Sequence, residues 1–370
     1  MSKKRGVDKV LFWIVCFAVM SGLFILLSSS MGLLARGDGA SFHGIIAQQS
    51  IFAIIGTALF FFFISKVRYK KLAAYALPIF IFGLVLTVLV FIPGIGFSHG
   101  GARRWVKMGP LFFQPTEVLK FSFVVYLAAW MASKHAGIKN FYTGFLPFIG
   151  ITAMAGLLIM LEPDMGTMGL LVVTGVSMFF VGGGKLKHLL LVFMAMLMVF
   201  SLMIYKKPYR MERVKVFLSP SYDEQGAGYQ LKQSLIAIGS GGLFGKGFGM
   251  SVQKFKYLPE PIGDSIFAVY AEEFGFLGSL FIISLFLFFL YKGFSVSIRA
   301  PDDFGRLLGV GLVILIVTQA FINIAAMIGI APLTGMPLTF VSKGGSALIV
   351  ALVEAGILLN ISKYSKNNRS

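Results

Sequence analysis

One acidic residue, Asp264, stands where a polar segment gives way to a long apolar run. The stretch from 255 to 278 reads FKYLPEPIGDSIFAVYAEEFGFLG and passes Pro259 and Pro261 before the apolar run begins. A carboxylate at the mouth of a membrane helix can act as a general base, and it can equally cap the first turn of that helix. The side of the membrane on which this mouth lies decides how it is interpreted.

Glu117 and Lys120 border a second apolar run and are three residues apart, which places both on one face of a helix. Arg103 and Arg104 precede them in the same loop. Ionisable residues at the end of a membrane helix are costly to bury, so the cluster favours a functional role. The alternative is structural, with Glu117 paired to Lys120 or to Arg104 to hold the loop.

Glu162 and Asp164 flank Pro163 between two apolar runs. Paired carboxylates can hold Mg²⁺ or Mn²⁺, but a turn in which Asp164 caps the next helix explains them as well and is favoured. The single cysteine, Cys16, excludes a disulfide or a thiolate metal cluster within one chain. The four histidines show no ligand spacing: His43, His99, His135 and His188.

The composition indicates that these residues belong to a membrane protein. Of 370 residues, 57% are hydrophobic and only 13% are charged, and the mean hydropathy is +0.85. A soluble chain carries a charged fraction of about 25%. The net charge of +18 does not indicate a nucleic-acid partner, because most cations lie in short loops between apolar runs.

We expect an all-α, polytopic membrane protein with ten transmembrane helices, since a helix needs about 20 apolar residues to cross the hydrocarbon. Residues 1–370 form one integral membrane domain in this interpretation. The predicted spans are roughly 10–34, 45–65, 73–92, 116–132, 143–161, 166–183, 188–205, 265–291, 306–328 and 345–362.

The placement of Lys and Arg predicts that both termini are cytoplasmic. With the N-terminus inside, most cations fall in inner segments, and ten spans return the acid-free tail KYSKNNRS to the cytoplasm. The short outer loops then hold only five cations: Arg36, Arg103, Arg104, Lys107 and Lys343. The same topology places the long loop 206–264, and therefore Asp264, on the outer face.

Within this loop, residues 229–238 read YQLKQSLIAI and predict a short amphipathic helix, on the membrane surface or inside the bundle, that ends at Gly239. The following GSGGLFGKGFG lacks the spacing of a Walker A loop or of a dinucleotide-binding loop. Its glycines indicate either tight backbone turns or a close approach to a ligand, and both alternatives stay open.

Five segments carry a resemblance to a known family: GGARRWVKMGPLFFQPTEVLK (100–120), EPDMGT (162–167), GAGYQLKQSLIAIGSGGLFGKGFG (226–249), KYLPEPIGDSIFAVYAEEFGFLG (256–278) and GMPLTFVSKGGSAL (335–348). In this order, over nearly the whole chain, they resemble the bacterial shape, elongation, division and sporulation (SEDS) proteins. YLPEP and the glycine run are more similar to FtsW than to RodA. The resemblance implies an enzyme of the bacterial cytoplasmic membrane that polymerises lipid II into peptidoglycan glycan strands, in division or elongation, with a class B penicillin-binding protein as partner.

The resemblance also implies roles for individual residues. The corresponding aspartate of the family is the essential catalytic residue, which makes Asp264 the expected general base for the acceptor sugar hydroxyl. Arg104 and Lys120 match family positions, and we expect them to contact the pyrophosphate or the sugars. Further candidates for substrate binding are Glu117, Arg103 and Lys256.

A pyrophosphate leaving group implies a divalent cation, Mg²⁺ or Mn²⁺, for which Glu162 and Asp164 are the weak candidate ligands. Lys256, together with Lys254, is also interpreted as part of a solvated basic loop that attracts anionic membrane lipid headgroups.

The chain departs from the family pattern close to the expected base. Ile262 and Gly263 stand where a His and a polar residue are frequent, and Ser265 stands where Phe is usual. Lys343 replaces an aromatic residue before GGS. These departures bear on substrate detail and on the choice between the FtsW and RodA branches.

Two other functions stay open. A lipid II flippase would need a polar path through the bundle, for which the acids within the predicted spans are candidates: Glu272, Glu273 and Glu354. For these three acids, packing or hydrogen-bonding roles are favoured over a proton path. A non-catalytic scaffold that activates a class B penicillin-binding protein would need only the loops.

Overall fold

The computed structural model describes residues 6–35, 39–99, 102–109, 111–133, 137–206, 208–218 and 226–365. Its helices are α1 (Lys9–Ala35), α2 (Gly39–Ser65), α3 (Lys70–Ala74), α4 (Ala76–Val88), the 3₁₀ turn η1 (Leu89–Phe91), α5 (Pro115–Ser133), the π-helical turn η2 (Phe141–Phe145), α6 (Leu146–Leu161), α7 (Met165–Val181), α8 (Leu186–Lys206), α9 (Pro208–Leu218), α10 (Ala227–Ser240), α11 (Gln253–Lys256), α12 (Ile266–Ile298), α13 (Asp303–Met327) and α14 (Gly345–Ser362). Each of the ten predicted spans overlaps one of these helices, so the helical membrane fold is confirmed.

Six helical segments are long and apolar enough to cross a membrane: Lys9–Leu34, Phe42–Ser65, Phe141–Leu161, Ile266–Ile298, Asp303–Met327 and Gly345–Ser362. Three shorter apolar segments, in α4 with η1, in α7 and in α8, match further predicted spans. The remaining predicted span corresponds to α5, which carries Glu117 and Lys120. That all ten helices cross the membrane stays a prediction.

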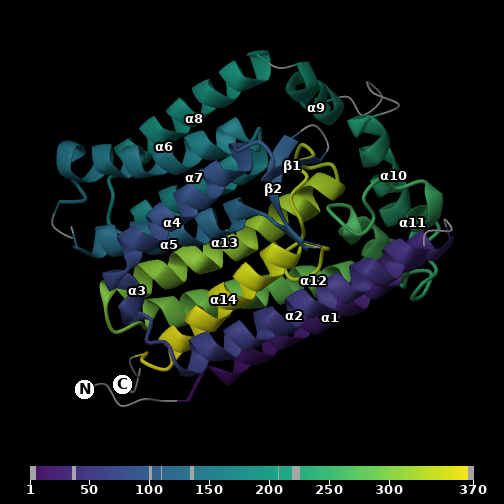
Figure 1. Cartoon of the computed structure of the whole chain (residues 1–370), viewed down its shortest axis with the longest axis horizontal. Helices are drawn as coiled ribbons and strands as arrows, with labels where there is room; N and C mark the ends of the chain where they lie inside the picture. The colour runs from purple at the N-terminus through teal and green to yellow at the C-terminus, as the bar shows by residue number, and fades with distance from the viewer. Residues whose placement is uncertain are drawn as a thin grey trace.

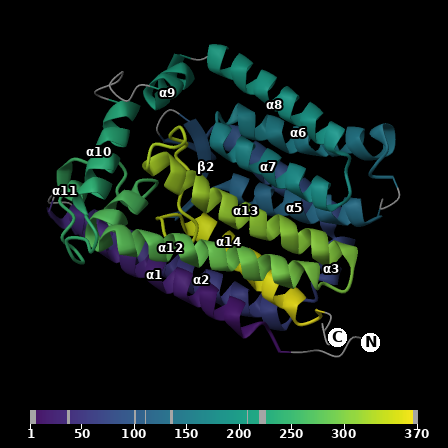
Figure 2. The same cartoon turned by 180° about the vertical axis from the view of Figure 1, so that it is seen from behind.

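The long helices lie side by side in one bundle, with α13 and α14 between α1 and α2 on one side and α6 and α8 on the other (Figures 1 and 2). The α13 helix packs against α12, α5 and α7, and α14 packs along α2. Most of α13 and α14 is buried, whereas α12 exposes much of its apolar surface. The core of the bundle is therefore built around α13 and α14.

A small sheet that the sequence did not predict follows η1. Its strands β1 (Gly96–His99), β2 (Ala102–Met108) and β3 (Leu111–Phe113) pair antiparallel in the order β1-β2-β3. The sheet lies toward the end of the bundle that carries α9, α10 and α11 (Figure 1). It brings the loop that holds Arg103 and Arg104 to the same end.

The amphipathic helix predicted in the long loop is confirmed as α10, which packs against α12 and α13 and so lies against the bundle. The helix ends at Ser240, two residues later than expected, because Gly239 lies inside it and Gly241 is its C-cap.

The glycine run after α10 binds to an interruption in α12 at Gly275, whose φ and ψ of 66° and −161° are not helical. The amides of Phe276 and Leu277 donate to the carbonyls of Gly242 (2.8 Å) and Leu243 (3.1 Å) instead of to the preceding helical turn. The glycine run and α12 lie so close together that a Cβ on Gly245 would lie 2.1 Å from the Glu273 carbonyl oxygen. The glycines thus serve close approach, but to the protein's own backbone.

Two buried glutamates of α12 fasten the same loop. Glu272 accepts hydrogen bonds from Lys246 Nζ (2.6 Å) and Ser251 Oγ (2.5 Å). Glu273 pairs with Lys254 Nζ at 2.6 Å. The favoured hydrogen-bonding role of both acids is confirmed, but the solvated position expected for Lys254 is wrong, because this lysine is fully buried.

The candidate active site

Asp264 precedes α12 and is half-buried. The N-cap position of α12 belongs to Ser265, which makes no side-chain cap, and its amide bonds to the Glu260 carbonyl at 3.3 Å. The interpretation of Asp264 as the helix cap is therefore wrong, and the structural need for an acid at this position must lie elsewhere.

Three elements converge on Asp264. From α10, Gln230 Nε2 lies 3.2 Å from Asp264 Oδ1. From α13, Asn323 Nδ2 donates to the Asp264 carbonyl oxygen at 2.7 Å and to the Met336 carbonyl oxygen at 2.8 Å. The third element is the segment between α13 and α14, where a Cβ on Gly335 would lie 3.9 Å from Asp264 Oδ2. Asp264 is therefore contacted by α10 at its carboxylate and by α13 at its main chain, and the segment between α13 and α14 passes close to Oδ2.

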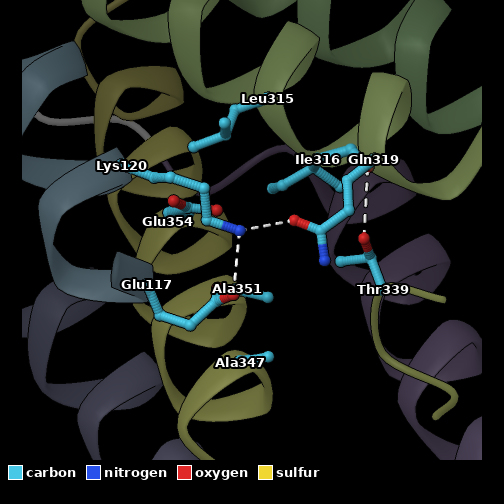
Figure 3. A pocket seen from close by; sticks show the side chains of 9 residues that line it. All are labelled: Glu117, Lys120, Leu315, Ile316, Gln319, Thr339, Ala347, Ala351 and Glu354. Carbon is cyan, nitrogen blue, oxygen red and sulfur yellow. Dashed lines mark hydrogen bonds and ion pairs between the residues drawn. The ribbon is translucent and has the colours of Figure 1, made fainter. Parts of the chain in front are cut away.

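The second predicted cluster forms inside the bundle (Figure 3). Lys120 Nζ lies 2.9 Å from Glu117 Oε1, and it donates to Gln319 Oε1 at 2.6 Å. Both charged side chains are almost fully buried. The predicted placement of Glu117 and Lys120 on one helical face is confirmed. Of the two structural pairings that stayed open, Glu117 with Lys120 is formed and Glu117 with Arg104 is not.

This cluster lines a pocket among α5, α13 and α14 (Figure 3), whose walls are Glu117, Lys120, Leu315, Ile316, Gln319, Thr339, Ala347, Ala351 and Glu354. Glu354 faces the bundle interior as expected, and among the described residues no hydrogen bond to its carboxylate is found. A substrate would have to enter this pocket to touch Lys120, because the lysine lies 3% exposed.

The pocket and Asp264 are joined through one face of α13. Gln319 Nε2 donates to the Pro337 carbonyl at 3.2 Å, and Asn323, one turn further, donates to the Met336 carbonyl. Since these carbonyls belong to consecutive residues, the two amides hold one short piece of chain between Lys120 and Asp264. The structure therefore brings the Lys120 cluster and Asp264 into one polar network.

Arg104 lies on β2 and reaches the turn between α6 and α7. Its Nε and Nη2 donate to the carbonyls of Glu162 (3.1 Å) and Pro163 (2.6 Å), and Nη1 lies 3.5 Å from Asp164 Oδ2. Gly166, at the start of α7, approaches Met336 closely. The arginine thus fixes a turn that touches the chain segment next to Asp264, and its side chain stays partly exposed.

Glu162 and Asp164 stay weak candidates for a divalent cation site. Asp164 accepts from the Thr167 amide at 3.0 Å, so the favoured interpretation as a helix cap is confirmed. Glu162 is fully buried, and burial together with Asp164 raises its pKa to about 9, against the opposing effect of Arg104. Both oxygens of its carboxyl have no hydrogen-bond partner in the described part of the chain. The described residues contain no group of three or more metal-ligating side chains.

The two remaining candidates are exposed. Arg103 lies on β2 opposite Ser98, and Lys256 is the last residue of α11. Neither of them has a side-chain partner in the described part of the chain that would hold it in place. They are available to anionic groups at this end of the bundle.

Sequence reasoning missed three amides that organise the site: Gln230, Gln319 and Asn323. Gln319 and Asn323 are four residues apart in an otherwise apolar run, and this helical spacing of polar residues was a usable signal. Gln230 gave no such signal, because it lies on the polar side of an amphipathic helix where glutamine is ordinary.

The profile of the family FtsW/RodA/SpoVE, described as "Cell cycle protein", matches residues 9–367. The chain belongs to this family. The SEDS membership expected from the five sequence segments is therefore confirmed.

Among its FtsW/RodA/SpoVE relatives, the chain is 38% identical over 365 residues to stage V sporulation protein E of Bacillus subtilis, covering 99% of both chains. It is 35% identical over 369 residues to the probable peptidoglycan glycosyltransferase FtsW of Geobacter sp. (strain M18), covering 98% of both. These two relatives leave the division or sporulation branch a prediction.

Solved structures share the fold. A chain from "Structural coordination of polymerization and crosslinking by a peptidoglycan synthase complex" is similar with a TM-score of 0.79 and 26% identity, covering 96% of this chain and 97% of that chain. The rod shape determining protein RodA of Thermus thermophilus gives a TM-score of 0.71 and 25% identity, with 98% of each chain covered.

Proposed function

We propose that this chain is a peptidoglycan glycosyltransferase that polymerises lipid II into glycan strands at the outer face of the bacterial cytoplasmic membrane, with Asp264 as general base. Membership of the FtsW/RodA/SpoVE family and the names of its FtsW relatives support the activity class. The observation that carries the assignment of the base is a half-buried carboxylate surrounded by three elements without being used as a helix cap.

Glycan polymerisation requires one nucleophilic substitution at the anomeric carbon of the donor sugar. Asp264 accepts the proton of an acceptor sugar hydroxyl, the hydroxyl oxygen forms a bond to the anomeric carbon of the donor, and the donor's bond to the polyprenyl pyrophosphate breaks. A divalent cation, when bound, would neutralise the leaving pyrophosphate. It stays a prediction from the reaction class, with Glu162 and Asp164 as weak candidate ligands.

Several cations lie at the same end of the bundle as Asp264 and can attract the pyrophosphate leaving group. Arg103 and Lys256 are exposed, and Arg104 keeps unused N–H groups beside the α6–α7 turn. These side chains attract pyrophosphate or anionic lipid headgroups. Lys120 and Glu117 lie deeper, and through Gln319 they order the chain segment next to Asp264.

The proposed orientation places both termini in the cytoplasm. The amide of Asp8 donates to Ser362 Oγ at 3.0 Å, which puts the start of α1 and the end of α14 together. An even number of spans gives this arrangement, and the basic residues of the inner segments favour the cytoplasmic side. A class B penicillin-binding protein is the proposed partner, by analogy with the peptidoglycan synthase complex that shares the fold.

The deciding experiment supplies labelled lipid II and Mg²⁺ or Mn²⁺ to the purified protein, with and without its transpeptidase partner. We expect glycan strands from the wild type and none from Asp264→Ala. Glu212→Gln, which removes an exposed acid on α9, is the matched control and should behave as wild type. Absence of strands under conditions in which an FtsW relative makes them would contradict the proposal, as would full activity of Asp264→Ala.

Lipid II transport is the second candidate, because Glu354 faces a polar pocket inside the bundle. Glu272 and Glu273 no longer support it, since both hold the outer loop. Flipping of lipid II in liposomes that survives Asp264→Ala, with no strands from the wild type, would favour this alternative. Activation of the transpeptidase by an Asp264→Ala protein that makes no strands would favour the scaffold.

A further inference from the structure

Gln230 lies in the first turn of α10 and reaches two neighbouring residues at the start of α12. Its amide nitrogen lies 3.2 Å from Asp264 Oδ1 and 3.0 Å from Ser265 Oγ. An amide nitrogen carries two hydrogens, so these two bonds use its whole donor capacity. Gln230 therefore acts on Asp264 and has no donor left for a substrate.

Ser265 fixes the position of this amide, and the carboxylate fixes its orientation. The serine is fully buried, and its hydroxyl accepts from Gln230 Nε2. Rotation of the amide by 180° would turn its oxygen toward the carboxylate, which is repulsive, whereas the Ser265 hydroxyl can bond to either end of the amide.

The main chain of Asp264 is held separately. Asn323 is 1% exposed and joins the Asp264 carbonyl to the Met336 carbonyl from the side of α13. Asn323 thus holds the main chain from α13, whereas Gln230 of α10 contacts the side-chain carboxylate. Gln230 and Asn323 therefore act on different parts of the same residue.

We propose that Gln230 is a positioning residue that holds the Asp264 carboxylate, in its ionised form, toward the acceptor hydroxyl, and that Ser265 anchors Gln230 for this task. The inference rests on the proposed function, since it assigns Gln230 a role only if Asp264 is the base. A donated hydrogen bond favours the ionised carboxylate over the protonated one. Without it, Asp264 stays protonated to higher pH and its side chain adopts other rotamers.

The test compares Gln230→Met, which keeps the length and removes the donor, with Gln233→Met on the same helix, which has no bond to Asp264 among the described contacts. We expect Gln230→Met to lower kcat about tenfold, with KM changed less than twofold, and to move the acidic limb of the pH–rate profile upward by about one pH unit. Gln233→Met should match the wild type in all three quantities.

Two variants of Ser265 give a second test, with smaller expected effects than Gln230→Met. Ser265→Ala removes the acceptor and should lower kcat severalfold with a smaller upward shift of the acidic limb. Ser265→Thr keeps the hydroxyl and should restore both. Thermal unfolding of each variant separates loss of fold from loss of positioning, because a positioning defect leaves the melting temperature unchanged while the pH profile moves.

The outcomes distinguish this inference from the proposed function. If Asp264→Ala abolishes strand formation while Gln230→Met retains the wild-type kcat and pH profile, the positioning role is wrong and the proposed function stands. If Asp264→Ala is active, both are wrong. A fall in kcat of Gln230→Met without any shift of the acidic limb would also overturn the proposal, because a purely structural contact would have that effect.

Discussion

Asp264 and Glu273 lie nine residues apart in the chain, yet their carboxylates are held in opposite ways. Glu273 is buried, with the Lys254 ammonium at 2.6 Å and the Ser28 hydroxyl at 2.7 Å. Asp264 is half-buried, and the neutral amide of Gln230 contacts its side chain. Within ten residues of sequence the chain thus contains one acid buried in an ion pair and one that stays partly exposed.

The role of an acid in this region therefore depends more on its partners in the fold than on the hydropathy of the surrounding sequence. A buried ion pair excludes substrate, and breaking it leaves an uncompensated charge inside the protein. Neutral amides orient a carboxylate without closing it off. The following changes test whether this division between a structural acid and a reactive acid holds.

The largest effect is expected on the reactive side. Asp264→Asn keeps the shape of the side chain but removes the base, so strand formation from labelled lipid II should fall by about 10²–10⁴-fold. We expect thermal unfolding to stay near the wild-type temperature, because the side chain of Asn has the same shape as that of Asp. A variant that loses activity only in proportion to a lower melting temperature would make Asp264 a structural acid after all.

The matching change on the structural side is Lys254→Met. It leaves Glu273 buried without its ammonium partner and should lower the free energy of unfolding by about 3–5 kcal/mol, measured by denaturant titration in detergent micelles. The double variant Lys254→Met, Glu273→Leu removes both charges and should recover most of the loss. Equal stability of the single variant and the wild type would contradict the importance of this pair.

A smaller loss is expected in the glycine run. Gly245 has φ of +82°, and a Cβ there would lie 2.1 Å from the Glu273 carbonyl oxygen. Gly245→Ala should therefore cost about 1–3 kcal/mol and expose the loop to proteolysis. Gly239→Ala is the control, since a Cβ on this helical glycine meets no atom within 4 Å. It should be neutral or stabilising, and equal cleavage of both variants would argue against the close contact.

A further change concerns the pH dependence of stability. The pKa of Glu162 is raised to about 9 in the folded protein, so both states hold the proton at low pH, and only the unfolded chain releases it as the pH rises. The wild type should therefore lose stability between about pH 5 and pH 9. Glu162→Gln cannot ionise and should flatten this dependence in melting curves. Parallel curves for both proteins would show that Glu162 ionises normally.

The sequence predicted the helices well, because each span is a continuous apolar run of the length that a bilayer requires. It also predicted the pair of Glu117 and Lys120, since a spacing of three residues acts within one helix. The segment predicted as α10 was found for the same local reason. These predictions depend on residues close together in the chain.

What the sequence did not show depends on long-range packing. Arg104 finds its partners 58 and 59 residues away, at Glu162 and Pro163, and the sequence alone could not choose between these and the alternative partner Glu117. Lys254 looked solvated in a basic loop, and only the fold shows that it enters the bundle. The interruption at Gly275 lies in an apolar run of uniform appearance, where hydropathy cannot locate a bend.

That interruption has a mechanical consequence. In an unbroken helix the amides of Phe276 and Leu277 would bond to the carbonyls of Glu272 and Glu273, whereas here Lys246 and Gly247 of the loop donate to those carbonyls. The loop and the helix have exchanged partners, so neither can move without the other losing backbone hydrogen bonds. A displacement of this loop would therefore also displace the first turns of α12, which directly follow Asp264.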